Sequence, residues 1–164
     1  MTRKLCKLLL PFLLIAFSLL ATAQDIPKWK IDQLEEYIRK SDRPVIVNFW
    51  ATFCKPCIVE VPYFQKLVKK YEQEGVELLL VSLDLEQSYK KIKPFAQKHH
   101  FTAPIVFLDE TNADEFCPRI DERWSGAIPA SLFINNKTGY RKFHEEQIPE
   151  KKLEGEIKLL IGKK

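Results

Sequence analysis

Apolar residues follow two patterns along the chain, and together these predict alternating strands and helices. Short apolar runs bounded by turn residues indicate strands buried on both faces of a sheet. Four runs have this character: 45–50, 76–83, 105–108 and 130–135. Elsewhere apolar residues recur every three or four positions, which is typical of helices that bury one face. These stretches are 31–40, 55–74, 88–99, 113–123 and a closing helix that starts around Pro149.

The order of these elements predicts an α/β fold. Strands that alternate with helices form a mainly parallel sheet with helices on both faces. A further strand at 140–144 follows the run 130–135 after a turn at 136–139, so these two strands should pair as an antiparallel hairpin. We therefore expect a mixed central sheet within one domain that covers residues 24–164.

Local signals mark the ends of two helices. Asp32 followed by Glu35 has the spacing of a capping box and is predicted to open the first helix. Gly75 is expected to end the second helix, and Pro62 to kink it.

Residues 1–23 have the pattern of a secretory signal peptide. Three basic residues precede an apolar run at 8–20, and Ala21-Thr22-Ala23 suits cleavage before Gln24. The run is shorter than the roughly 20 residues that a membrane-spanning helix needs. An uncleaved membrane anchor is the alternative, and in either case we expect an exported, periplasmic or otherwise extracytoplasmic protein.

Charge and cysteine content narrow the classes of function. Cleavage after residue 23 would remove three basic residues and no acidic ones, which lowers the net charge from +4 to +1 and argues against a nucleic-acid partner. The remaining chain keeps Cys54, Cys57 and Cys117, too few cysteines for a disulfide framework. One redox pair and a spare thiol fit this count.

Cys54 and Cys57 lie where a buried strand gives way to a helix, a placement that suits reversible disulfide chemistry. The partial positive charge of the helix N-terminus and the adjacent Lys55 stabilise a thiolate, so we expect the pKa of Cys54 to lie below its ordinary value of about 8.5. Cys54 is thus the predicted nucleophile. Cys57, one turn inside the helix, should stay protonated until it resolves a mixed disulfide. Pro56 fixes the backbone between the two cysteines.

Two other uses of the cysteine pair stay open. A purely structural disulfide would close a very short loop and stabilise the fold little. Zinc would need two further ligands, and His99, His100, His144 and Cys117 do not form a second pair with ligand spacing, so no metal site is predicted.

The segment from Phe49 to Cys57, FWATFCKPC, resembles the active-site segment of thioredoxins, and most of all that of the exported TlpA/ResA branch. Pro62 matches the proline of the thioredoxin active-site helix, and Ile128-Pro129 matches the cis-proline of that family. The resemblance covers residues 27–162. It implies a thioredoxin fold, no cofactor beyond the cysteine pair, and a TlpA-type strand–helix insertion before the cis-proline.

The resemblance also implies which residues contact substrate: Trp50, Phe53, Ile128 and Pro129. A cis bond at Pro129 would place the Ile128 backbone where an extended substrate strand can hydrogen-bond to it.

Glu60 matches a functional glutamate of ResA-like proteins, one helical turn after Cys57, where a carboxylate could act on the thiol during resolution. The alternative is a solvated surface charge. Asn48 stands where thioredoxin has a buried aspartate, which would shift any proton relay towards Glu60.

The predicted function is that of an enzyme, a monomer that reduces disulfides in extracytoplasmic proteins and is recharged by a membrane electron donor. Oxidase or isomerase activity is one alternative, since sequence does not report a redox potential. A Cu(I) carrier that uses Cys54 and Cys57, with or without Cys117, is another, because thiolates are soft ligands. Cys117 itself is expected to be a small buried apolar residue, and a third redox thiol is the alternative.

Overall fold

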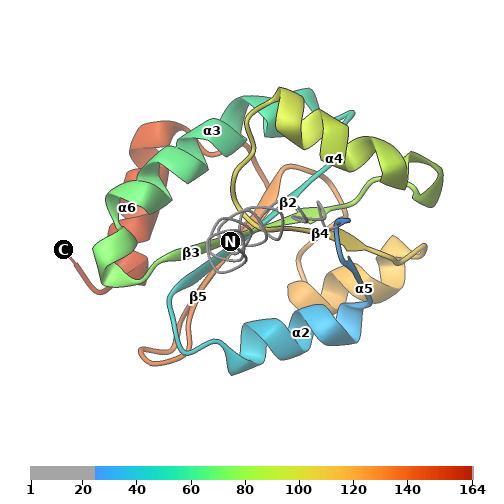
Figure 1. Cartoon of the computed structure of the whole chain (residues 1–164). Helices are drawn as coiled ribbons and strands as arrows, with labels where there is room; N and C mark the ends of the chain where they lie inside the picture. Colours follow the sequence, from blue (N-terminus) through green and yellow to red (C-terminus); the bar gives the residue numbers. More distant parts are fainter. Residues whose placement is uncertain (1–24, 164) are drawn as a thin grey trace, which may run out of the picture.

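The computed structural model describes residues 25–163, which form a six-stranded sheet between two layers of helices (Figure 1). The strands are β1 (Lys28–Trp29), β2 (Val45–Trp50), β3 (Glu77–Ser82), β4 (Ile105–Leu108), β5 (Ala130–Asn135) and β6 (Tyr140–His144). The α-helices are α2 (Ile31–Lys40), α3 (Lys55–Lys70), α4 (Tyr89–Lys98), α5 (Ala113–Ile120) and α6 (Glu150–Leu160). Two 3-10 helices, η2 (Glu72–Glu74) and η3 (Glu86–Ser88), precede β3 and α4.

The sheet is mixed, as the sequence predicts, with the strand order β1-β4-β3-β2-β5-β6. The first four strands of this order are parallel, β5 is antiparallel to β2, and β6 is antiparallel to β5. Phe49, near the end of β2, pairs with Ala130, the first residue of β5. The loop that follows β2 and the loop that precedes β5 therefore meet at the same end of these two neighbouring strands.

Helices cover both faces of the sheet and divide the core into two apolar clusters. Helices α3, α4 and α6 lie over one face, and α2 and α5 over the other (Figure 1). Alternate residues of β2 enter different clusters: Ile46 and Trp50 face α3, whereas Val47 and Phe49 face α2. All six residues of β2 are buried, which explains why its sequence is a continuous apolar run and not an alternating one.

Most predicted elements are confirmed, and the differences lie at their ends. The second helix stops at Lys70, before η2 and Gly75, whose backbone is left-handed with a φ of 74°. Helix α5 stops at Ile120 because Asp121 is extended, with a φ of −153°. Pro62 lies inside α3 and Pro149 at the N-cap of α6.

The predicted capping box is wrong. Lys30 is the N-cap of α2, and its amide N–H donates to the Gln33 side chain over 2.9 Å. Asp32 and Glu35 instead form ion pairs with Arg119 of α5, a tertiary contact that competes with local capping. The two-residue strand β1 was not predicted, because so short a segment has no pattern of its own.

The predicted signal peptide at 1–23 lies outside the described residues. Within residues 25–163 no helix is both long and apolar enough to cross a membrane. The chain between β3 and β5 contains η3, α4, β4 and α5. Part of this segment is predicted to correspond to a TlpA-type insertion, and this correspondence stays a prediction.

Candidate active site

Cys54 is the N-cap of α3, at the point where the chain leaves β2. Its amide N–H donates to the Ala51 carbonyl over 3.0 Å, which turns the chain sharply after the strand. Its carbonyl accepts the Ile58 N–H over 3.1 Å, and its sulfur accepts the Cys57 N–H over 3.3 Å. The sulfur thus occupies the position in which a capping side chain binds a free amide of the first turn.

A disulfide joins Cys54 to Cys57, with the two Cα atoms 5.3 Å apart. Cys54 is 6% exposed and Cys57 is fully buried, so in the oxidised state only Cys54 reaches the surface, and only slightly. Cys54 is thus the more accessible of the two sulfurs, and the order of action, attack by Cys54 and resolution by Cys57, stays a prediction. The exposure of Cys54 is smaller than the sequence alone would suggest.

Asp84 holds the loop that carries the cysteines. This carboxylate, 4% exposed, lies just after β3 and accepts hydrogen bonds from the Thr52 N–H (3.1 Å), the Thr52 hydroxyl (2.5 Å) and the Ser82 hydroxyl (2.8 Å). In addition, the Leu83 N–H donates to the Trp50 carbonyl over 2.8 Å. The start of the active-site loop is therefore tied to the neighbouring strand, not left free.

Replacing Asp84 with alanine should lower the free energy of unfolding by about 2–3 kcal/mol, because Thr52 N–H and two hydroxyl groups lose a charged acceptor in a buried place. Urea denaturation of the oxidised protein measures this loss. Asp42, an exposed carboxylate, provides the matched control Asp42→Ala, which should change little. Equal effects of the two substitutions would show that Asp84 does not hold the loop.

The peptide bond between Ile128 and Pro129 is cis, as the resemblance implies. In the register of β2 and β5, in which Phe49 pairs with Ala130, the next position places Pro129 opposite Trp50. The cis-proline thus lies beside the strand end from which the cysteine loop departs. Pro129 is buried and Ile128 is half-buried. Within residues 25–163 neither the amide nor the carbonyl of Ile128 forms a hydrogen bond.

Glu60 is completely buried, which contradicts the alternative of a solvated surface charge. One carboxylate oxygen accepts the Asn48 side-chain amide over 2.9 Å and the other accepts the Ile148 N–H over 3.0 Å. The same Asn48 amide also donates to the Ser131 hydroxyl over 3.0 Å. Burial raises the pKa of Glu60 to about 7, although both hydrogen bonds act in the opposite direction. Glu60 is thus a buried acid able to exchange a proton near neutral pH.

Comparison with known proteins assigns the chain to a family. The family model described as AhpC/TSA matches residues 16–139. The chain belongs to the AhpC/TSA family. Several curated relatives carry the name thiol-disulfide oxidoreductase ResA, and two of them illustrate the similarity. The protein of Bacillus cereus is 33% identical over 91 residues, which cover 56% of this chain and 48% of the relative. The protein of Bacillus thuringiensis (strain Al Hakam) is 33% identical over 117 residues, 70% of this chain and 61% of the relative.

A solved structure supports the thioredoxin-like fold of this AhpC/TSA family member. The thioredoxin-related protein from Neisseria meningitidis serogroup B superposes with a TM-score of 0.64 at 28% identity, over 75% of this chain and 88% of that chain. The chain spans about half the length of the first curated relatives it matches. The thioredoxin fold expected from the resemblance is confirmed.

The residues predicted to contact substrate differ in exposure in this AhpC/TSA family member. Phe53, next to Cys54 in the chain, is 67% exposed. Trp50 is fully buried against Phe101, with ring centroids 5.1 Å apart, so it offers no surface to a substrate.

The residues predicted to tune the Cys54 thiol occupy the first turn of α3. Lys55 and Pro56 are its first two residues, and both are exposed. Their place in the first turn is compatible with the predicted roles, a positive charge beside the thiol and a fixed backbone between the cysteines. Both roles stay predictions.

Cys117 is a free thiol and is buried, as expected. It belongs to the apolar cluster under α2 and α5, on the opposite side of the sheet from Cys54 and Cys57. Burial, with the nearby charges of Glu145 and Asp114, raises its pKa to about 11. Within residues 25–163 no group of three or more histidine, cysteine, aspartate or glutamate residues could hold a metal ion.

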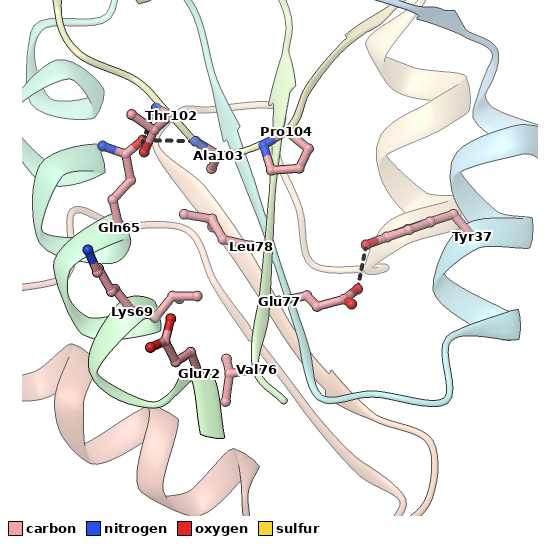
Figure 2. A pocket seen from close by; sticks show the side chains of 11 residues that line it. Tyr37, Gln65, Lys69, Glu72, Val76, Glu77, Leu78, Thr102, Ala103 and Pro104 are labelled. Atoms are coloured by element: carbon pink, nitrogen blue, oxygen red, sulfur yellow. Dashed lines mark hydrogen bonds between the residues drawn. The ribbon is translucent and has the colours of Figure 1, made fainter. Parts of the chain in front are cut away.

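The cavity shown in Figure 2 is separate from the cysteine pair. Its volume is about 400 Å³, and its walls include Leu78 at the start of β3, Pro104 just before β4 and Gln65 of α3. It therefore lies at the amino ends of β3 and β4, whereas Cys54 follows the carboxyl end of β2. Gln65 accepts the Ala103 N–H over 3.1 Å and so fixes one wall of the cavity.

Proposed function

We propose that the protein is an extracytoplasmic thiol-disulfide oxidoreductase that reduces protein disulfides through the dithiol of Cys54 and Cys57. The observation that carries this proposal is the disulfide between Cys54, the N-cap of α3, and Cys57 in its first turn. The loop that carries Cys54 lies beside the cis-proline. The names of the ResA relatives and the shared family support it.

The reaction proceeds by two exchanges. In the reduced protein the Cys54 thiolate attacks one sulfur of the client disulfide, a bond forms between Cys54 and the client, and the other client sulfur leaves as a thiolate. The Cys57 thiolate then attacks the Cys54 sulfur and displaces the second client thiolate. Two electrons pass to the client, and the protein is left with the Cys54–Cys57 disulfide, the form seen in the structure.

The N-terminus of α3 lowers the barrier to the first exchange. The free amides and partial positive charge of the first turn stabilise the Cys54 thiolate, and Lys55 adds a second positive charge. No cofactor enters the reaction, because the cysteine pair carries both electrons.

Glu60 acts in the second exchange. Cys57 must lose its proton before it can attack, and it is buried away from water. Glu60 lies one turn further along α3, is also buried, and has a pKa raised to about 7 by that burial. It is therefore suited to accept the proton near neutral pH.

The client surface consists of Phe53 and the backbone of Ile128 at cis-Pro129. An extended client segment can pair with this backbone while an apolar side chain covers Phe53. The clients are disulfide-containing proteins outside the cytoplasm, and a membrane electron donor returns the disulfide to the dithiol. The proposed extracytoplasmic location rests on residues 1–23, which have the pattern of a signal peptide. We propose that the protein acts as a monomer and that nucleic acid is not one of its partners.

An insulin-precipitation assay and a redox titration test this function. With dithiothreitol as donor, the protein should accelerate the reduction of insulin disulfides, and titration against glutathione should place its potential well below about −120 mV, the value of a strong oxidant. No acceleration would exclude the oxidoreductase. A potential near or above that value would replace the reductase with an oxidase.

A further inference from the structure

Glu145 lies beside the loop that leads to the cis-proline. It directly follows β6, and in the register of β5 and β6, in which Ser131 pairs with His144, its position is opposite Ala130. The loop 125–127 is neither helix nor strand, so its backbone amides have no partners within regular structure. Such a loop needs other acceptors if it is to hold one conformation.

One carboxylate oxygen of Glu145 accepts several hydrogen bonds from this loop. It accepts the N–H of Ser125 and the N–H of Ala127, each over 3.0 Å, and also the hydroxyl of Ser125. Burial raises the pKa of Glu145, but the hydrogen bonds from Ser125 and Ala127 outweigh it and hold the pKa below its ordinary value.

The opposite side of the loop is fixed to the core. The Trp124 ring packs on Phe49 with centroids 4.4 Å apart, and its indole N–H donates to the Ala127 carbonyl over 2.9 Å. Gly126 has a φ of 92°, and a side chain there would lie 3.7 Å from the Cys117 sulfur. Both peptide groups of Ala127 are thus held, one by Trp124 and one by Glu145, immediately before Ile128.

We propose that Glu145 is a positioning residue for client binding, which orients the Ile128 backbone through Ser125 and Ala127. This inference rests on the proposed function, since it concerns how the oxidoreductase holds a polypeptide. A client strand that pairs with Ile128 needs the amide and carbonyl in a fixed direction. A small disulfide without an extended backbone makes no such contact and does not depend on Glu145.

The test compares two substrates in single turnovers of the reduced protein, followed by acid quenching and alkylation. Insulin is the polypeptide and bis(2-hydroxyethyl) disulfide the small molecule. Glu145→Ala should raise the insulin concentration needed for half-maximal rate about tenfold, comparable to the loss of one good hydrogen bond, and leave the maximal rate unchanged. Its rate with the small disulfide and its redox potential should match the wild type.

Glu146→Ala is the matched control, because Glu146 is the next residue, is exposed and pairs with Lys152. It should behave as the wild type with both substrates. Unchanged half-saturation by insulin in Glu145→Ala, or equal losses with both substrates, would overturn the proposal.

Two milder variants provide the test if Glu145→Ala does not fold. Glu145→Gln keeps an acceptor oxygen without its charge, and Ser125→Ala removes one donor. Each should raise half-saturation by insulin about threefold and spare the small disulfide. If both match the wild type, the proposal is wrong. A wild-type protein that reduces neither substrate would instead refute the oxidoreductase and this inference together.

Discussion

Replacing Cys57 with alanine should turn the short-lived mixed disulfide into a stable covalent complex with the client. Cys54 keeps its place at the N-terminus of α3 and can still attack, but no thiol remains to displace the client. Turnover should therefore be lost completely while the first exchange survives. Gel electrophoresis of the full chain under non-reducing conditions, followed by mass spectrometry, would detect and identify the bound partner.

The other two cysteines supply the controls. Cys54→Ala should form no complex and show no activity, because Cys57 is fully buried and cannot reach a client disulfide. Cys117→Ala should behave as the wild type, since this thiol lies in the core on the other side of the sheet. If Cys54→Ala formed the complex equally well, the assignment of the attack to Cys54 would be wrong.

The sequence predicts the fold well because its strongest signals are local. Strands such as Val45–Trp50 and Ala130–Asn135 are buried on both faces, so their composition alone marks them. The cysteine pair and Ile128-Pro129 are recognisable for the same reason: each is a short motif whose residues are neighbours in the chain. The structure adds that β2 and β5 are paired, which brings the two motifs together.

The residues that support the site could not be predicted in this way. Asp84 is 32 positions from Thr52, and Glu145 is 18 positions from Ala127, so their roles exist only once the sheet has formed. The hydrogen bond that Glu60 accepts from the Ile148 N–H likewise spans 88 positions. The failed capping box has the same cause, since Asp32 meets Arg119 across two helices. In each case a carboxylate has a generic sequence context and a specific tertiary partner.

The buried Glu60 should make the protein less stable as the pH rises from about 4.5 to 7. In the unfolded chain this carboxyl loses its proton near 4.5, whereas in the folded protein its pKa is raised to about 7 by burial. Between these values the folded state holds a proton that the unfolded state has released, so the stability contributed by protonated Glu60 is complete below pH 4.5 and is lost by about pH 7. The shift corresponds to a fall of about 2–4 kcal/mol in the free energy of unfolding.

Denaturation of the oxidised protein at intervals from pH 5 to 8 measures this fall, and Glu60→Gln should remove most of it because an amide does not ionise. The comparison concerns how stability changes with pH and not its absolute value, because the single oxygen of glutamine cannot accept from both Asn48 and Ile148, which removes a hydrogen bond independently of pH. Glu36→Gln is the control: the hydrogen bond to Lys40 holds the pKa of Glu36 below its ordinary value, so its effect falls below pH 4.5 and the slope above that should stay as in the wild type. A wild-type curve that is flat from pH 5 to 8 would mean that Glu60 is already ionised throughout. Its pKa would then be ordinary, the carboxylate would be too weak a base to take the proton of Cys57 at neutral pH, and Cys57 would need another base.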